Sequence, residues 1–321
     1  MSPKVATPDG MKIFCGTANP ELARAIAKSL KVPLGEILSS RFSEGEIRIK
    51  INEDVRGRDI FLIQPTCPPV NDNVMELLII LDAFRRASAR RITAVLPYYG
   101  YARQDRKDQP RVPITAKLMA NIITEAGADR VLTMDLHAQQ IQGFFDIPVD
   151  HLYAFPVIAS YIRKKKLKNL TIVSPDVGGI KMARAYAKGL NADLAIVDKR
   201  RTGPNEVEAM NLIGEVKGRT VLIPDDMIAT AGSLVEAVNA LVKFGAADIY
   251  ASCTHAILSG NAVEKIKKSV LKEVVVTDTI PIPQEKRIDK ITVLPVAPLF
   301  GEAILRIHNE ESISSLFNDV I

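Results

Sequence analysis

The chain has 321 residues, of which 47% are hydrophobic, so it can bury a large core and a globally disordered chain is excluded. Its 42 Lys and Arg residues exceed its 37 Asp and Glu residues only modestly, and this excess suits an enzyme of small polyanions as well as it suits nucleic acid. Tryptophan is absent and aromatic residues make up 5%, which argues against a base-stacking platform. We therefore expect no nucleic-acid partner.

The cysteines and the N-terminus indicate the compartment. Cys15, Cys67 and Cys253 are odd in number and far apart, with no metal-ligand spacing, which predicts a reducing compartment. The first eight residues contain no long apolar run, so we expect neither a signal peptide nor a membrane span. The sequence thus predicts a cytoplasmic protein with no membrane partner.

Apolar runs alternate with helical patterns along the chain. The runs that predict strands are 60–64, 92–96, 131–134, 170–173, 194–197, 220–223 and 249–252. The patterns that predict helices are 19–30, 73–88, 115–126, 154–165, 181–188 and 234–244. Because the strands are continuously apolar, both faces of their sheets should be covered, as in the parallel sheets of α/β proteins.

Two stretches of the first half recur in the second half. Residues 91–97 resemble 219–224, and residues 127–137 resemble 245–255. The first pair is offset by 128 residues and the second by 118. The first half therefore carries about ten extra residues, which predicts a projecting loop at 98–113.

A duplication of one α/β unit explains this echo, and chance similarity between strand–helix units is the alternative. The boundary should lie near 150–155, after the last strand of one unit and before a new helix. The predicted division is a first domain at 1–153, a second at 154–305, and a C-terminal tail at 306–321 that packs back on the first domain.

A phosphate site is predicted between residues 221 and 234. An apolar run ends at two adjacent carboxylates, Asp225 and Asp226, and the small residues 230–233 precede a helical pattern. Free backbone N–H groups and the helix dipole favour an anion at such a junction. Paired carboxylates suit sugar hydroxyls, so the segment indicates a sugar phosphate. The alternative is a surface turn capped by an Asp side chain.

This segment resembles the phosphoribosyl-diphosphate signature, an apolar strand ending in Asp-Asp with Thr-x-Gly-Thr a few residues on. Transferases that use phosphoribosyl diphosphate carry the signature, and so does the synthetase that makes it. Ala229 stands where the signature generally has a third acid, and Ser233 replaces a Thr while keeping the hydroxyl.

The predicted projecting loop carries a second signal. Three tyrosines, Tyr98, Tyr99 and Tyr101, precede the polar run 103–108. Arginine suits bidentate recognition of phosphate, so a nucleotide is one interpretation and a subunit contact is the other. The pattern from 97 to 107, PYYGYARQDRK, resembles the ribose-phosphate diphosphokinase family, the phosphoribosyl-diphosphate synthetases, and not the transferases.

The resemblance covers essentially the whole chain; its further segments are 41–46, 134–138, 141–145, 174–179 and 198–201. It implies two similar phosphoribosyltransferase-like domains, each a mainly parallel sheet flanked by helices. It also implies transfer of the diphosphoryl group of ATP to the 1-hydroxyl of ribose 5-phosphate. The products would be 5-phosphoribosyl 1-diphosphate and AMP, for nucleotide, histidine and tryptophan biosynthesis.

The resemblance implies roles for individual residues. Those implied to bind ATP are Phe42, Glu44, Gly45, Glu46, Arg103, Gln104 and Asp108. Those implied to bind ribose 5-phosphate are Arg201, Asp225, Asp226, Thr230, Ala231, Gly232 and Ser233. Lys199 is implied to be catalytic, and His137 and Asp176 are implied to hold Mg²⁺.

Taken alone, these residues also have plain structural interpretations. His137 follows a predicted strand, where α/β sheets bind ligands, but a strand-end histidine is more often a structural hydrogen-bonding group. Asp176 precedes Val-Gly-Gly, a backbone that can approach phosphate closely or simply form a turn. Lys199 and the two arginines after it follow a predicted strand. They would form either a mobile loop that closes over bound phosphates or a solvent-exposed basic surface.

Members of this family form homohexamers, with an effector site for phosphate or ADP at subunit contacts. Arg56, Ser312 and Ser314 match that site, and a simple helix cap is the alternative for the two serines. Asp54 stands where some members have Ser, and its charge would weaken anion binding. We expect a hexamer with a blunted effector response.

Two other functions stay open. A phosphoribosyltransferase would consume the same product, although the tyrosine–arginine loop and the two-domain length argue against it. A non-catalytic regulatory homologue is disfavoured because His137, Asp176, Lys199 and Arg201 are all retained.

Overall fold

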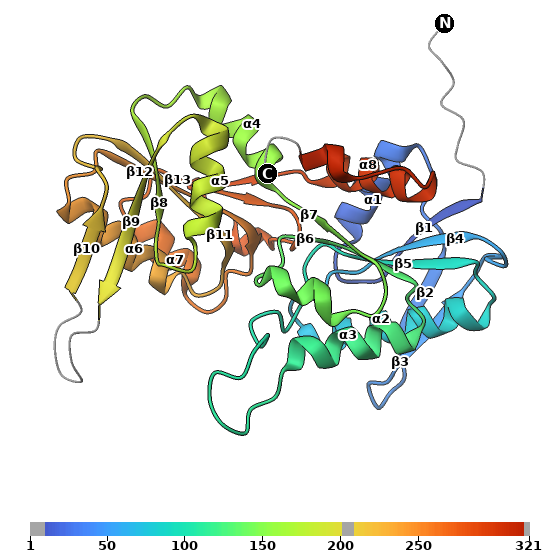
Figure 1. Ribbon diagram of the computed structural model, residues 1–321. Helices are drawn as coiled ribbons and strands as arrows, with labels where there is room; N and C mark the ends of the chain where they lie inside the picture. Colours follow the sequence, from blue (N-terminus) through green and yellow to red (C-terminus); the bar gives the residue numbers. More distant parts are fainter. Residues whose placement is uncertain (1–9, 201–208, 318–321) are drawn as a thin grey trace, which may run out of the picture. The chain divides into compact units, whose positions relative to one another are not determined.

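The computed structural model describes residues 10–200 and 209–317, which form two compact units (Figure 1). The first unit contains the chain up to Tyr153, with the later segments 279–281 and 296–316. The second unit contains 154–278 and 282–295. Every helix within the described ranges is too short or too polar to serve as a transmembrane segment.

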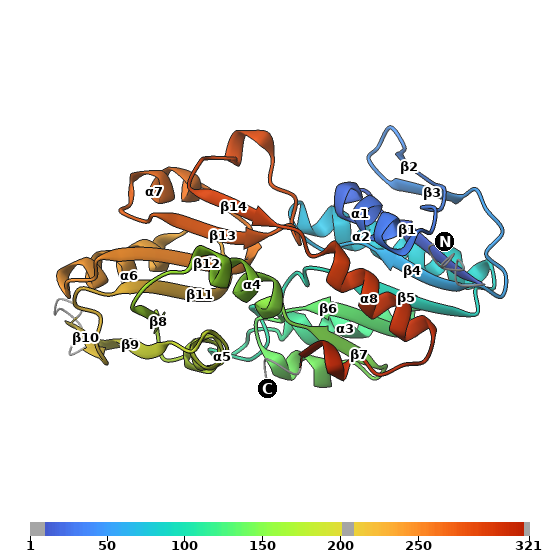
Figure 2. The ribbon, with the colours of Figure 1, turned by 90° about the horizontal axis from the view of Figure 1, so that it is seen from above.

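The first unit is built on a five-stranded parallel sheet in the order β1-β4-β5-β6-β7. Its strands are β1 (Met11–Cys15), β4 (Asp59–Ile63), β5 (Arg91–Leu96), β6 (Arg130–Met134) and β7 (Val149–Leu152). Helices α1 (Pro20–Leu30) and α8 (Ala297–His308) cover one face, and α2 (Val70–Arg86) and α3 (Thr115–Ala126) cover the other (Figure 1 and Figure 2). Because both faces are covered, β4 is buried along its whole length.

Beside this sheet stands a separate antiparallel hairpin, β2 (Ile37–Arg41) and β3 (Ile47–Ile51). Its isoleucines at 37, 49 and 51 pack against the core of the first unit. Two short 3-10 helices, η1 (Gln139–Phe144) and η3 (Ser314–Phe317), complete this unit.

The second unit is built on a seven-stranded sheet in the order β10-β9-β8-β11-β12-β13-β14, in which only β10 is antiparallel to its neighbour. Its strands are β8 (Leu170–Ser174), β9 (Asp193–Arg200), β10 (Ala209–Ile213), β11 (Thr220–Ile228), β12 (Asp248–Ala256), β13 (Glu273–Thr277) and β14 (Ile291–Leu294). Its helices are α4 (Phe155–Lys165), α5 (Ile180–Leu190), α6 (Gly232–Lys243), α7 (Ala262–Lys268) and the 3-10 helix η2 (Gln284–Lys286). Helix α4 packs with α5, and α6 packs with α7.

The predicted α/β class with mainly parallel sheets is confirmed. The similar stretches of the two halves occupy corresponding places in the fold. Strands β5 and β6 are parallel neighbours connected through α3, and strands β11 and β12 are parallel neighbours connected through α6. The connection before α3 runs from 97 to 114, whereas the one before α6 runs only from 229 to 231. The extra residues of the first half therefore lie in the loop where they were expected.

Two expectations were wrong. Strand β11 does not end before the carboxylate pair but continues to Ile228, because β12 pairs with it as far as Ala256. Residues 296–305 were expected in the second domain. They belong to the first unit, because α8 packs against α1.

Candidate functional site

The loop from 97 to 114 leaves the carboxyl end of β5 and exposes Arg103, Gln104 and Asp108. Its base is held by backbone hydrogen bonds, from Gln104 N to Tyr101 O at 2.9 Å and from Ala116 N to Gln104 O at 3.1 Å. The implied ATP-binding side chains of this loop are therefore exposed to solvent, and backbone hydrogen bonds hold the ends of the loop in place.

Two of the three tyrosines of this loop are buried. Tyr98 and Tyr99 are 7% and 3% exposed, and the Tyr99 hydroxyl donates to Ala116 O at 2.8 Å. The Tyr101 hydroxyl donates to the side-chain oxygen of Asn71. Apolar burial therefore explains Tyr98 and Tyr99.

His137 lies exposed just after β6, the parallel neighbour of β5. Gln140 Nε2 donates to Asp105 Oδ2 at 2.9 Å, which joins the segment after His137 to the loop that carries Arg103. The two loops thus lie together at the carboxyl edge of the first sheet, where open α/β sheets bind ligands.

The turn 42–46 joins β2 to β3 and holds the other implied ATP-binding residues, Phe42, Glu44, Gly45 and Glu46. Gly45 has φ +98°, a left-handed backbone that favours glycine. Phe42 is 47% exposed, and the Arg48 guanidinium lies 5.8 Å from its ring centre. Figure 1 shows the turn apart from the loop 97–114, and within the described residues no hydrogen bond or ion pair joins the two segments.

In the second unit, Asp225 and Asp226 lie inside β11, near its carboxyl end. Asp226 is 9% exposed, and its backbone N–H donates to Asp225 Oδ1 at 2.8 Å. Burial, followed by the charge of Asp226, raises the pKa of Asp225 well above its ordinary value. The carboxylate pair therefore favours a proton, a cation or hydroxyl donors at this position.

Residues 229–231 separate β11 from α6, whose first residue is Gly232. Ala231 has φ +56° and no side chain caps the helix, so the first N–H groups of α6 lack a side-chain acceptor. Such N–H groups attract an anion. The segment implied to bind the phosphate, Thr230 to Ser233, thus has the predicted strand–loop–helix geometry.

Sequence reasoning missed Lys265 of α7. Its Nζ donates to Thr230 O at 3.2 Å and lies 3.8 Å from where a Cβ on Gly232 would stand. This places a cation beside the loop before α6. The sequence shows Lys265 only as one of several lysines on a short helix, so it carries no signal that distinguishes it.

Asp176 lies exposed between β8 and α5, and its Oδ1 accepts a hydrogen bond from Gly179 N at 2.9 Å. A Cβ on Gly179 would come within 2.9 Å of Ser174 Oγ, so this close approach favours glycine. The structural interpretation as an Asp-capped turn is correct. The second oxygen, Oδ2, has no hydrogen-bond partner among the described residues and remains suitable as a ligand atom.

Lys199 lies within β9, opposite Met210 of β10, whereas the predicted strand ended at Val197. Arg201 falls outside the described residues. The backbone at Lys199 is therefore strand rather than loop, because β10 pairs with it in antiparallel fashion.

The implied Mg²⁺ ligands belong to different units, His137 to the first and Asp176 to the second. Within 10–200 and 209–317, no group of three or more His, Cys, Asp or Glu side chains could hold a metal ion. Magnesium commonly keeps several waters and takes one or two protein carboxylates together with substrate phosphates. The carboxylate of Asp176 fits that mode of binding.

The implied effector residues are engaged within the first unit. Arg56 N donates to Asp54 Oδ1 at 3.1 Å, and Arg56 Nη1 donates to Ser88 Oγ at 3.2 Å. Ser314 N donates to Ser312 Oγ at 3.2 Å, at the start of η3, which fits the helix-cap interpretation of the two serines. In the described part of the chain, no hydrogen bond links Arg56 to either serine.

The parallel sheets and the loops at their carboxyl edges define an α/β enzyme. A model of the N-terminal domain of ribose phosphate pyrophosphokinase matches residues 11–127, and a model of the phosphoribosyl synthetase-associated domain matches residues 199–318. The chain belongs to the ribose-phosphate pyrophosphokinase family.

Individual relatives agree with this assignment. A ribose-phosphate pyrophosphokinase of Gloeobacter violaceus is 56% identical over 308 residues, covering 96% of this chain and 93% of the relative. One of Caldanaerobacter subterraneus is 58% identical over 310 residues, covering 96% of this chain and 98% of the relative. The crystal structure of phosphoribosylpyrophosphate synthetase from Mycobacterium smegmatis superimposes with a TM-score of 0.89 at 41% identity, covering 94% of this chain and 99% of that one.

Proposed function

We infer that this protein transfers the β,γ-diphosphoryl group of ATP to the 1-hydroxyl of ribose 5-phosphate, giving 5-phosphoribosyl 1-diphosphate and AMP. The observation that carries this proposal is the uncapped N-terminus of α6, which follows the half-buried Asp225 and the buried Asp226 at the end of β11. Helix N–H groups suit the 5-phosphate, and the carboxylates suit ribose hydroxyls. Family membership supports the same reaction.

The proposed ribose 5-phosphate site comprises Arg201, Asp225, Asp226 and residues 230–233. The proposed ATP-binding residues are those of the turn 42–46 and of the loop that carries Arg103, Gln104 and Asp108. Phosphoryl-transfer catalysis is mostly positioning and neutralisation of charge. Lys199 is proposed to neutralise charge on the transferring group.

Mg²⁺ is the proposed cofactor, with Asp176 and His137 as its protein ligands. Bound to the ATP phosphates, it would neutralise part of their charge. Carboxylate oxygen suits Mg²⁺ better than imidazole does, so Asp176 is proposed as the stronger ligand of the two.

Assembly, regulation and location belong to the same proposal. We propose a cytoplasmic homohexamer that supplies nucleotide, histidine and tryptophan biosynthesis. Phosphate and ADP are proposed effectors at Arg56, Ser312 and Ser314. Because the Asp54 side chain already accepts from Arg56 N, its charge would oppose an anion there and blunt the response.

The deciding experiment measures AMP formation from ATP and Mg²⁺, with and without ribose 5-phosphate. We expect AMP only with the sugar phosphate, and loss of turnover by at least about a hundredfold in Lys199→Ala, in the range for loss of one transition-state contact. Lys243→Ala, an exposed lysine at the far end of α6, is the control and should behave as the parent.

Two results would favour the other functions. Diphosphate release that requires a nucleobase would indicate a phosphoribosyltransferase. Binding of ATP and ribose 5-phosphate without AMP formation would indicate a non-catalytic homologue.

A further inference from the structure

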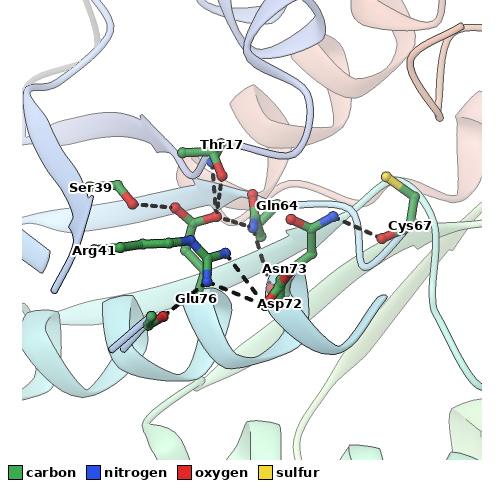
Figure 3. A network of polar contacts seen from close by, with 9 residues as sticks. Thr17, Ser39, Arg41, Gln64, Cys67, Asp72, Asn73 and Glu76 are labelled. Carbon is green, nitrogen blue, oxygen red and sulfur yellow. Dashed lines mark hydrogen bonds and ion pairs between the residues drawn. The ribbon is translucent and has the colours of Figure 1, made fainter. Parts of the chain in front are cut away.

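The carboxylate of Glu76, on α2, is buried and lies at the centre of a polar network in the first unit (Figure 3). Glu76 is 2% exposed. Its Oε2 accepts hydrogen bonds from Thr17 N at 3.0 Å, Thr17 Oγ1 at 2.7 Å and Gln64 Nε2 at 2.7 Å, and its Oε1 accepts from Ser39 Oγ at 2.7 Å. No ion pair in the described part of the chain includes Glu76, so hydrogen-bond donors stabilise its charge.

These donors come from three separate segments. Thr17 follows β1, Gln64 follows β4, and Ser39 lies in the hairpin strand β2. Gln64 is itself held in place, because its Oε1 accepts from Ala18 N at 3.2 Å. Glu76 therefore has three hydrogen bonds from the central sheet region and one from the hairpin.

The hairpin lies along α2 with matched spacing. Ile37, Ser39 and Arg41 alternate along β2 and share one of its faces, with a repeat of roughly 6.6 Å. Residues 72 and 76 are four residues apart on one face of α2, which separates them by about 6 Å along the helix axis. Because these spacings match, two contacts form side by side. Ser39 donates to Glu76, and Arg41 pairs with Asp72, with 3.4 Å between Arg41 Nη2 and Asp72 Oδ1.

The two polar contacts between the hairpin and α2 differ in strength. The side chains of Arg41 and Asp72 are 51% and 50% exposed, and exposed ion pairs often contribute nothing measurable. The Ser39–Glu76 bond is charge-assisted and has a buried acceptor, which makes it the stronger of the two. A two-stranded hairpin is marginally stable by itself, so such an anchor matters.

We propose that Glu76 is a positioning residue that holds the β2–β3 hairpin through Ser39 and thereby sets the turn 42–46 for the nucleotide. This rests on the proposed function, in which that turn binds ATP. Arg41 transmits the position, because its Nη1 also donates to Gly45 O in the turn at 3.0 Å. Glu76 touches no substrate in this scheme.

The most direct test is Ser39→Ala. This variant removes the hydroxyl through which the hairpin donates a hydrogen bond to Glu76, and it leaves the hydrogen bonds from Thr17 and Gln64 to Glu76 intact. Ser39→Thr keeps the hydroxyl and should restore parental behaviour. Ser40→Ala is the matched control, because Ser40 lies on the opposite face of the same strand. Each variant is measured by deuterium exchange of the 37–51 amides, by calorimetric ATP binding, and by KM for each substrate with kcat.

We expect faster exchange in the hairpin of Ser39→Ala alone, with ATP affinity weakened about tenfold, the factor that corresponds to one charge-assisted hydrogen bond. KM for ribose 5-phosphate and kcat should stay within about twofold, a split that general destabilisation would not produce. Unchanged exchange in Ser39→Ala would overturn the anchor. Faster exchange with parental ATP affinity would overturn the link to the nucleotide.

The proposed function can fail separately. If the parent binds ATP but forms no AMP from ribose 5-phosphate, the proposed reaction is wrong. Exchange and calorimetry, which need no turnover, then still decide whether Glu76 sets the turn for the nucleotide.

Discussion

Arg91 donates two hydrogen bonds to the carboxylate of Asp59, from Nε to Oδ1 at 2.9 Å and from Nη2 to Oδ2 at 2.5 Å. The Asp59 side chain is fully buried and also lies 2.7 Å from His308 Nδ1. Arg91 Nη2 donates further to Ile307 O at 3.1 Å. This pair therefore joins the first residues of β4 and β5 to the end of α8, although 216 residues separate Arg91 from Ile307.

Loss of this buried carboxylate should destabilise the first unit. Asp59→Ala leaves the Arg91 guanidinium without its partner, so we expect a loss of roughly 3–5 kcal/mol in the free energy of unfolding. Urea denaturation followed by circular dichroism measures it. Asp82→Ala, which breaks the exposed pair with Arg86, is the control and should cost about 0.5 kcal/mol or less. Equal costs in the two variants would contradict this account.

Glu273 should make the second unit sensitive to acid. Burial opposes its ionisation, but the ion pair with Lys165 and the hydrogen bonds from Thr292 and Tyr161 together outweigh burial and hold the pKa of Glu273 below its ordinary value of 4.5. A lowered carboxyl pKa gives stability that is present above 4.5 and lost as the pH falls below it.

The test compares urea midpoints from pH 7 to pH 3 in the parent and in Glu273→Gln. The variant should be less stable than the parent at pH 7, and the difference should shrink as the pH falls below 4.5. A difference that stays constant with pH would rule out the charge of Glu273 as the cause.

The carboxylate pair of β11 should lower the folding stability of the second unit and contribute to the binding of ribose 5-phosphate. Because burial and the charge of Asp226 raise the pKa of Asp225, ionisation of Asp225 destabilises the folded second unit as the pH rises above 3.8. Asp226→Asn removes the second of these causes, so it should be more stable than the parent at pH 8 in metal-free buffer, by on the order of 1 kcal/mol. The same variant should bind ribose 5-phosphate more weakly. A variant that loses stability, or keeps full affinity, would refute this trade-off.

Lys265 should contribute to the binding of the sugar phosphate. Lys265→Met removes the cation beside Thr230 while keeping the aliphatic stem, so we expect KM for ribose 5-phosphate to rise about tenfold, as for loss of one charged hydrogen bond. Lys268→Met, an exposed lysine on the same helix, is the control. Steady-state kinetics with ATP saturating gives both values, and a similar KM in the two variants would remove Lys265 from the site.

Much of this architecture is determined by the sequence itself. Continuously apolar runs such as 220–223 and 249–252 become central parallel strands, because only a sheet covered on both faces buries every side chain of such a run. The echo between the two halves similarly predicts two α/β units. The segment Thr230–Ser233 is identified from sequence because local residue types specify a strand–loop–helix junction.

Tertiary structure alone decided the rest. Tyr98 and Tyr99 are core residues, because burial depends on which elements cover a loop and not on its composition. Strand β11 extends through Asp225 because its neighbour β12 supplies hydrogen-bond partners that no local pattern reveals. The bonds of Glu76 to Thr17, Ser39 and Gln64 span 59, 37 and 12 residues of sequence. Such contacts between distant segments arise only when packing brings their elements together, so a single sequence does not predict them.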